Sequence, residues 1–429
     1  MTDSAREPAV PRPLPPKITR SEWAMLLVLV AIHFTHMVDF VIIMPLGGRL
    51  MSELAISPQQ FSWIVSAYAL AAGIASLVAT LGMDRFDRKS VLLTMYAGFT
   101  LSTLLCGLAP DYATLLVGRT LAGVFGGLAA VAIMAVIGDV IPHEKRGRAM
   151  GAITSSFAVA SIVGLPIGLL LAEHYGRGAP FVVLAALSAM VWVVAVVRLP
   201  QVREHLAHER RHPLREFAAV AKEGNHLRAF AFSFFLVLGT FTVASFIAPY
   251  LAATNGWTEG DLALIYLAAG VCTLFGMSIV GNLADRMPRL RLFRILGFGA
   301  LVMGVLITNL PPTSLFVAAA AVSGFMIFAA GRIVPAQAMM LGSAQPRVRG
   351  AFMSLNTAVQ HLGTGVAPLL AGWIVTEKNG KILDFPLVGL VAALAAAVSL
   401  VLAGTLRPAA TIPIPATPQP EVEREAVTA

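Results

Sequence analysis

Long apolar runs alternate with short polar connections along almost the whole chain. A helix that crosses the hydrocarbon of a bilayer needs about 20 mainly apolar residues, and twelve runs approach or exceed that length. They lie at 23–49, 61–82, 90–108, 112–138, 149–171 and 179–197, and again at 229–251, 262–284, 292–310, 314–340, 351–375 and 385–406. A polar, basic stretch between Arg198 and Arg228 separates the sixth run from the seventh. The pattern predicts an all-α membrane protein with twelve transmembrane helices.

The two sets of six runs repeat the same landmarks. Four of these recur at offsets of 201 to 204 residues: Asp84 with Asp285, Arg146 with Arg349, Pro166 with Pro368, and Pro45 with Pro249. A near-constant offset indicates duplicated halves, and such halves place a solute site between them, near the bilayer midplane. The expected organisation is a disordered cytoplasmic tail over 1–22, a six-helix bundle over 23–199, a cytoplasmic linker over 200–228, a second six-helix bundle over 229–406, and a disordered cytoplasmic tail over 407–429.

Composition supports residence in lipid, and the charges set an orientation. Hydrophobic residues make up 57% of the 429-residue chain and charged residues only 13%, whereas soluble proteins carry about 25% charged residues. The net charge of +8 does not require nucleic acid, because 25 of the 31 Lys and Arg residues fall in tails and connections on one side. This positive-inside bias predicts that both termini are cytoplasmic. The two cysteines, Cys106 and Cys272, have no metal-binding spacing.

Polar motifs occupy matching connections in the two halves. The segment Thr80–Lys89 carries Asp84, Arg85 and Arg88, and Gly281–Arg289 carries Asp285, Arg286 and Arg289. An acid and several cations at helix ends can pair across a gate in one conformation and separate in another. Asp139, at the end of the fourth run, is expected to pair with Arg85 or Arg88 in the same cytoplasmic gate.

These segments resemble the signature loop of the major facilitator superfamily. Arg119 among Gly118, Gly123 and Gly126 is similar to the family's fourth-span signature, and Gly164-Leu-Pro166-Ile-Gly168 is similar to the fifth-span signature of drug:proton antiporter-1 exporters, including the arabinose-efflux-permease-like group. The resemblance covers residues 23–406. It implies that spans one, four, seven and ten line a cavity, and that the protein exports a solute in exchange for protons. The glycines and Pro166 are expected to serve helix packing and hinge motion.

Several polar residues fall inside the apolar runs, where an ionised group costs about 2.5–3.5 kcal/mol on insertion scales. His36 and Asp39 share a helix face because they are three residues apart, and with Arg119 they form the predicted proton-coupling group. Asp39 is the expected proton carrier. The predicted substrate cavity consists of Arg332, Gln337, Asn356, Gln360 and His361.

Three functions follow from these patterns. The first is proton-coupled efflux of a small organic compound, such as a drug, a sugar or a nucleoside-like molecule, by alternating access. The second is proton-coupled import of an organic anion held by Arg119 and Arg332. The third is a scramblase or membrane assembly factor that carries no solute. We expect a monomer in the bacterial inner membrane, with the proton gradient as energy source, no metal or cofactor, and no enzymatic activity, because nucleophile–base pairs and phosphate-binding loops are missing from the sequence.

Overall fold

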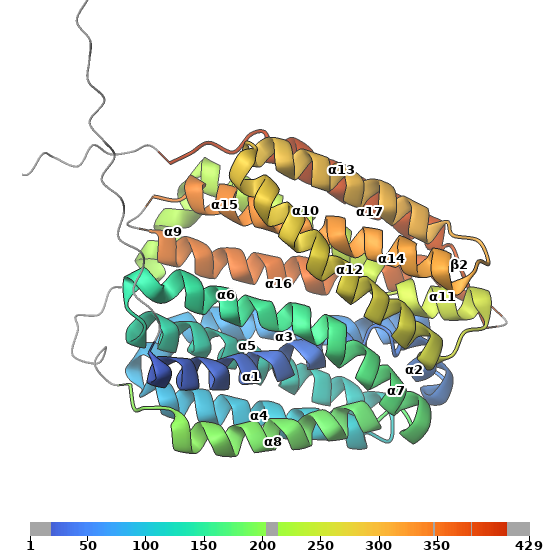
Figure 1. The fold of residues 1–429 in the computed structure, drawn as a ribbon, viewed down its shortest axis with the longest axis horizontal. Coiled ribbons are helices and arrows are strands. Elements are labelled where there is room, and N and C mark those ends of the chain that lie inside the picture. The colour runs from blue at the N-terminus through green and yellow to red at the C-terminus, as the bar shows by residue number, and fades with distance from the viewer. Residues whose placement is uncertain (1–18, 203–212, 346–347, 379, 410–429) are drawn as a thin grey trace, which may run out of the picture.

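The computed structural model describes residues 19–202, 213–345, 348–378 and 380–409. Two helical bundles lie side by side with their helices running in roughly the same direction (Figure 1). Eleven helical segments in the described residues are long and apolar enough to cross a membrane. The 26-residue helix α16 (Arg349–Ile374), the eleventh span in chain order, brings the total to twelve and carries Asn356, Gln360 and His361 along its middle. The predicted twelve-helix fold is therefore confirmed.

The N-terminal half contains the first six spans. Its elements are α1 (Arg20–Ile42), α2 (Gly47–Leu54), α3 (Pro58–Gly82), η1 (Met83–Arg85), α4 (Arg88–Leu108), α5 (Tyr112–Val140), α6 (His143–Val159), η2 (Ala160–Gly164), α7 (Leu165–Tyr175) and α8 (Ala179–Arg198).

The C-terminal half repeats this plan after a short linker helix, α9 (Pro213–Lys222). Its other elements are α10 (Gly224–Ala244), α11 (Ile247–Asn255), α12 (Glu259–Arg286), α13 (Arg289–Thr308), α14 (Leu315–Gly331), α15 (Ile333–Ser343), α16, β1 (Thr376–Lys378), β2 (Lys381–Leu383) and α17 (Phe385–Ala403). The antiparallel pair β1–β2 aligns Thr376 with Leu383.

The structure shifts two predicted boundaries by a few residues. Helix α1 begins at Arg20, inside the predicted tail, because the Thr19 side chain caps it and Glu22 completes a capping box. Helix α10 begins at Gly224, inside the predicted linker. The remaining predicted tail residues, 1–18 and 410–429, and the linker residues 203–212 lie outside the described residues.

Four spans are interrupted rather than continuous. The first breaks ahead of α2 at Pro45, and the seventh breaks between α10 and α11, just ahead of Pro249. The fifth contains the π-helical turn η2, just before Pro166. A proline has no N–H to donate to the preceding turn, which accounts for an irregular turn at this point. The tenth span breaks at Arg332, between α14 and α15.

The two ends of the molecule along the helix direction carry different elements. The termini end carries the start of α1 and the end of α17, and the hairpin end carries α2, α11 and β1–β2 (Figure 1). At the termini end, one apolar cluster lies wholly within the first half and another lies wholly within the second. The largest cluster lies toward the hairpin end and draws residues from both halves. The halves are thus closed against each other at the hairpin end.

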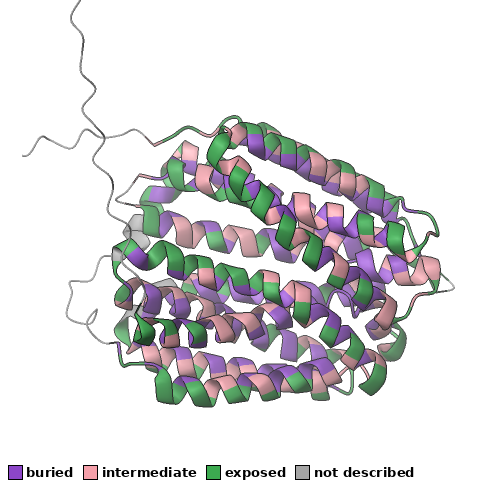
Figure 2. Cartoon of the chain, in the orientation of Figure 1, coloured by how far each residue is buried: buried purple, intermediate pink, exposed green. Residues whose placement is uncertain are grey.

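The seam between the halves consists of α3 against α16 and of η2–α7 against α12. Buried positions concentrate inside the bundles, and exposed positions follow the outer faces (Figure 2). Those faces carry large apolar side chains such as Val197, Phe298 and Leu394, each more than 60% exposed. An outer surface of this kind suits contact with lipid acyl chains, not water.

Candidate functional site

A buried ion pair lies in the interior of the N-terminal half. Asp39 on α1 and Arg119 on α5 are both fully buried, and Arg119 Nη1 donates to Asp39 Oδ2 over 2.8 Å. The same nitrogen donates to the Asp39 carbonyl oxygen at 3.1 Å, and Thr103 on α4 donates to Asp39 Oδ1 at 3.3 Å. Among the described residues, Arg119 Nε and Nη2 find no acceptor. The carboxylate is therefore the counter-charge on which this buried guanidinium depends.

Tyr68 on α3 is the second partner of Arg119. The guanidinium carbon lies 4.4 Å from the centre of the tyrosine ring, within the range of a cation–π interaction. The Tyr68 hydroxyl is hydrogen-bonded to His36 Nδ1 at 2.7 Å. Gly126 leaves the room for this bond, because a Cβ there would lie 2.6 Å from His36 Nδ1 and 2.9 Å from the Tyr68 oxygen. The structure thus brings together His36, Asp39 and Arg119, the three residues of the predicted proton-coupling group.

Aromatic rings connect this group to the other half. The Phe40 ring centre lies 5.6 Å from that of Tyr68 and 5.7 Å from that of Phe241 on α10. Phe241 in turn lines a cavity between the halves. Tyr68 and Phe40 therefore form a continuous line of ring contacts from Arg119 to Phe241 in the cavity wall.

The cavity has a volume of about 240 Å³ and is lined by both halves. The N-terminal half contributes residues of α1, the α1–α2 turn, α6, η2 and α7, and the C-terminal half contributes residues of α10, α11, α12, α14 and α15. Its wall is mainly aliphatic and aromatic, including Phe157, Phe241, Phe325 and Met326. A mostly apolar cavity at a domain interface is the usual setting of a small-molecule site.

The predicted cavity residues do not line this space. Arg332 is buried within the C-terminal half, where its Nη2 donates to the Leu236 carbonyl at 3.0 Å and to Thr240 Oγ1 at 2.6 Å. Thr240 is part of the cavity wall, so Arg332 stands directly behind that wall. Asn356 is buried, His361 and Gln360 are partly buried, and Gln337 is exposed. His361 packs against α3 at Gly73, on the seam.

The predicted gate residues lie at the termini end. Arg88 Nε and Asp139 Oδ2 form an ion pair at 3.0 Å, which joins α4 to α5 within one half. Arg85 is exposed, and so are Asp285, Arg286 and Arg289, although Arg289 also donates to the Ala338 carbonyl at 3.3 Å. The side chain of Asp84 lies outside what the structure describes. The Arg88–Asp139 pair and the Arg289–Ala338 hydrogen bond each join two helices of the same half. A gate that pairs charges between the halves therefore stays a prediction.

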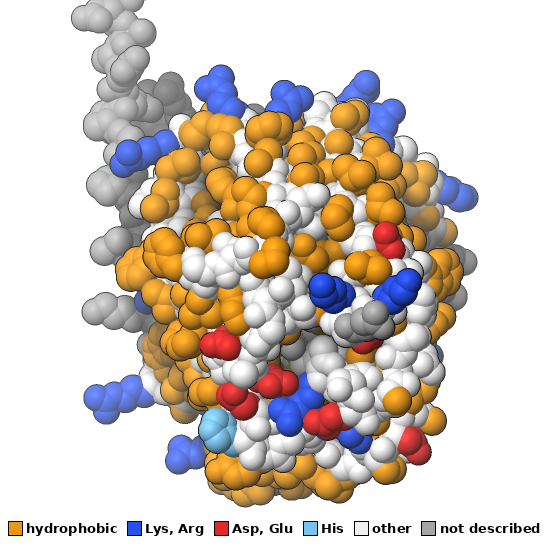
Figure 3. All heavy atoms as spheres, turned by 90° about the vertical axis from the view of Figure 1, so that its right-hand side faces the viewer, with side chains coloured by type: hydrophobic (Ala, Val, Ile, Leu, Met, Phe, Trp, Pro, Cys, Tyr) orange, Lys and Arg blue, Asp and Glu red, His pale blue; other side chains and the backbone are white. Residues whose placement is uncertain are grey.

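A second set of charges, not predicted, lies at the hairpin end. Arg49 on α2 pairs with Glu53 at 2.5 Å and with Glu259 on α12 of the other half at 3.5 Å. Arg177 also pairs with Glu53, at 3.3 Å. Figure 3 shows acidic and basic side chains gathered around a hollow on that face, and Arg49, Glu53 and Glu259 line a pocket of about 540 Å³ there. The Arg49–Glu259 pair therefore connects the halves at their closed end.

The predicted packing residues lie where helices approach most closely. Gly123 faces the Tyr68 backbone on α3, and Gly168 faces Ile42. A Cβ on Gly164 would lie 2.5 Å from a methyl group of Val38. Pro166 is buried directly after the π-helical turn. A larger side chain at any of the three glycines would push α3 or α1 away.

Sequence reasoning missed the aromatic partners. Tyr68 and Phe40 carry no charge, and a buried aromatic in an apolar run is indistinguishable from ordinary packing. One signal was available, because Tyr68 is one of only six tyrosines in the chain and falls in the middle of an apolar run. Hydroxyl groups inside a membrane span need a partner.

Known proteins share this architecture. The model of the Major Facilitator Superfamily matches residues 29–231 and again 229–428, one match for each half. The uncharacterized MFS-type transporter YceJ of Bacillus subtilis is 31% identical over 364 residues, which are 83% of this chain and 90% of that protein. Multidrug resistance protein 2 of Bacillus subtilis is 23% identical over 83% of this chain and 90% of its own length.

Solved structures agree on the fold. An inward-facing, unoccupied bacterial homolog of the human lysosomal transporter Spinster superposes with a TM-score of 0.72 at 16% identity, covering 91% of this chain and 98% of its own. A D-xylose-proton symporter superposes with a TM-score of 0.71 at 13% identity, covering 90% and 97%. At these identities the likeness concerns the arrangement of helices alone.

Proposed function

This chain belongs to the Major Facilitator Superfamily of multi-pass membrane transporters, and from that premise we propose that it exports a small organic compound in exchange for protons. The observation that carries the proposal is the sealed Asp39–Arg119 pair, joined through Tyr68 and Phe40 to a cavity between the halves. The name of its relative Multidrug resistance protein 2 and the fifth-span motif support the outward direction.

Asp39 is the proposed proton carrier. When its carboxylate is ionised, Arg119 is held by a charge-assisted hydrogen bond of 2.8 Å. When a proton binds, that attraction is lost, and the guanidinium keeps only its hydrogen bond to the Asp39 carbonyl and its contact with the Tyr68 ring. Tyr68 lies on α3, the helix that packs against α16 across the seam. Proton occupancy thereby biases the contact between the two halves, which is the two-state element that alternating access requires.

The closed hairpin end supports a proposal for the side from which the cavity is reached. Since the apolar cluster shared by the halves is at the hairpin end, we propose that in this conformation the solute approaches from the termini end. We propose that the termini are cytoplasmic, as the positive-inside bias predicts, which makes this an inward-facing state. The protein is proposed to act as a monomer in the inner membrane, to carry out no enzymatic reaction, and to need no cofactor besides the proton gradient.

Transport in everted membrane vesicles tests the proposal. Radiolabelled chloramphenicol is the first probe, and an overexpression screen for resistance across chemical classes extends it to further compounds. Wild-type vesicles are expected to accumulate the probe when the interior is acidified, and Asp39→Asn is expected to abolish this accumulation. Asp111→Asn is the matched control, because Asp111 is an exposed helix cap at the hairpin end and asparagine caps equally well.

Two results would reject the proposal. One is gradient-driven accumulation by Asp39→Asn at the wild-type rate, with both proteins present in equal amounts in the membrane. The other is a wild-type protein that changes neither resistance nor accumulation of any compound in the screen, which would favour a role without solute transport.

A further inference from the structure

The wall of the central cavity has a simple chemistry. Of the residues that line it, none is acidic, basic or an amide, and four carry a hydroxyl. The four are Ser161, Thr240, Tyr266 and Thr273. All other lining positions are aliphatic, aromatic, methionine, glycine or proline. A buried surface of this composition favours apolar ligands, because each polar ligand group that enters must find one of these few partners or remain unpaired.

Three of the four hydroxyls already donate their hydrogen to their own helix. Ser161 donates to the Phe157 carbonyl at 3.0 Å, and Thr273 donates to the Ala269 carbonyl at 2.7 Å. Thr240 donates to the Leu236 carbonyl at 3.2 Å and accepts from Arg332 at 2.6 Å. Such back-bonded hydroxyls are held in place by the helix and offer a ligand no free donor.

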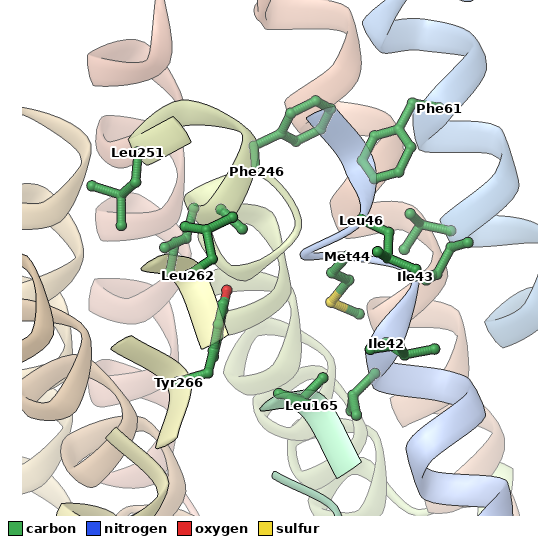
Figure 4. Packing of buried hydrophobic residues seen from close by; sticks show 14 of the residues in the cluster. Ile42, Ile43, Met44, Leu46, Phe61, Leu165, Phe246, Leu251, Leu262 and Tyr266 are labelled. Carbon is green, nitrogen blue, oxygen red and sulfur yellow. The ribbon is translucent and has the colours of Figure 1, made fainter. Parts of the chain in front are cut away.

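Tyr266 on α12 differs from the other three. Its side chain is 6% exposed, and within the described parts of the chain its hydroxyl makes no hydrogen bond, so the hydroxyl is left free toward the cavity that Tyr266 lines. In Figure 4 the hydroxyl end of the Tyr266 side chain is directed toward Leu262, on the side of α12 that faces Met44 and Leu165. Because Met44 and Leu165 belong to the other half, this donor lies between the halves. A buried tyrosine hydroxyl normally has a partner.

We infer that Tyr266 is the polar anchor of the cavity, and that the transported compound is uncharged and lipophilic, with a hydrogen-bond acceptor that the Tyr266 hydroxyl binds. This inference rests on the proposed export function and names its substrate class. Arg332, directly behind Thr240, adds positive potential on the far side of the wall, which favours an acceptor group and disfavours a lipophilic cation.

Sugars and nucleosides fit this cavity poorly. A sugar presents several hydroxyl donors and acceptors, while the side chains of the wall offer one free donor and four hydroxyl oxygens. Each ligand group left unpaired on burial carries its full desolvation penalty. A carboxylate finds no cation on the wall itself, so an organic anion is disfavoured as well.

Ligand binding to the purified full-length protein in nanodiscs tests this without any gradient. The probe is Nile red, an uncharged dye with a carbonyl acceptor, measured by fluorescence against empty nanodiscs. Wild-type protein is expected to bind Nile red saturably. Tyr266→Phe keeps the ring and removes the donor, and is expected to weaken binding roughly five- to tenfold, the value of one buried hydrogen bond. Ala330→Leu narrows the cavity and is expected to weaken binding further.

Controls and competitors complete the design. Tyr112→Phe makes the same chemical change at a tyrosine that does not line the cavity, and is expected to bind Nile red as wild type does. Progesterone, an uncharged lipophilic compound with two ketone acceptors and no donor, is expected to displace the dye, and uridine, D-xylose and ethidium are not. Displacement by uridine, xylose or ethidium at concentrations similar to those of progesterone, or an unchanged affinity in Tyr266→Phe, would overturn the inference.

The outcomes separate this inference from the proposed function. Saturable, Tyr266-dependent binding without accumulation in everted vesicles would reject proton-coupled export and leave the ligand class standing. Asp39-dependent export of a sugar or a nucleoside would support the transport function and reject the ligand class.

Discussion

Closure at the hairpin end is expected to depend on aromatic packing more than on the ion pair that crosses the same seam. Phe61 on α3 is fully buried, and its ring centre lies 5.5 Å from that of Phe246, in an edge-to-face arrangement between the two halves. Figure 4 shows both rings facing each other at the top of the shared cluster. Opening this end separates the rings, so Phe61→Ala removes an interaction present only in the closed state.

The magnitude follows from burial. Transfer of a phenylalanine side chain out of water stabilises the closed state by about 1.5–3 kcal/mol, and the edge-to-face pair adds about 0.5–1.5 kcal/mol. Together these amount to about 2–4.5 kcal/mol, so Phe61→Ala should raise the population of the open form by roughly thirty- to two-thousandfold, until that form dominates. The Arg49 side chain is 22% exposed and its bond to Glu259 is 3.5 Å long. A pair of that kind contributes about 0.2–1 kcal/mol, so Arg49→Ala should raise the open population no more than about fivefold.

Cysteine labelling measures the open population. The reporter is Ala248→Cys, a buried position on α11 that lines the hairpin-end pocket, in a Cys272→Ser background, where the native Cys106 remains buried. A membrane-impermeant thiol reagent is added from the hairpin side, and the labelling rate is compared among variants. Trp63→Ala is the matched control, because Trp63 is on the same helix and 43% exposed.

Equal acceleration by Phe61→Ala and Trp63→Ala would refute the reasoning, since it would show general loosening of α3. A larger effect of Arg49→Ala than of Phe61→Ala would also refute it, and would assign closure to electrostatics. Measurements at low and high salt distinguish the two causes independently, because screening weakens only the ion pair.

Two further outcomes are expected. Asp139→Arg should impair gradient-driven transport, because it breaks the ion pair with Arg88. The added change Arg88→Asp should restore part of the transport activity. If the double variant is no more active than the single variant, this pair has no part in the mechanism. Gly126→Ala should lower the free energy of unfolding by about 1–3 kcal/mol, because its methyl group would meet both His36 and Tyr68. Gly281→Ala is the matched control, since a Cβ there meets nothing within 4 Å, and chemical denaturation of the two proteins in detergent shows whether the effect is specific.

The number and class of the membrane spans could be predicted from the sequence, because run length and apolarity are local properties. The positions at which a span is interrupted were harder to predict from the sequence. Pro45 and Pro166 mark two of them, but the first apolar run extends to residue 49, whereas α1 ends at Ile42. The eleventh span, α16, was predicted correctly in spite of its polar residues, since they fall on an otherwise apolar run.

The candidate site was predicted in part. His36, Asp39 and Arg119 are conspicuous because charge and hydrogen-bonding capacity are costly in a bilayer, and the structure brings all three together. Arg332 is equally conspicuous, yet it is directed behind the cavity wall, toward Leu236 and Thr240. The energetic cost of a charge in lipid shows that such a residue must be buried within the protein. It does not show which part of the interior the residue occupies.

The sequence by itself determined that the chain spans a membrane twelve times in two related halves, and that a few polar groups must be hidden from lipid. Only the tertiary structure decided that Asp39 meets Arg119 across 80 residues of chain, that the Tyr68 ring lies against the guanidinium, and that Tyr266 lies between the halves. The physical reason is that partners across helices depend on how each helix is rotated and how closely it packs. That rotation is set by the summed contacts of the whole bundle, and no single run of residues encodes it.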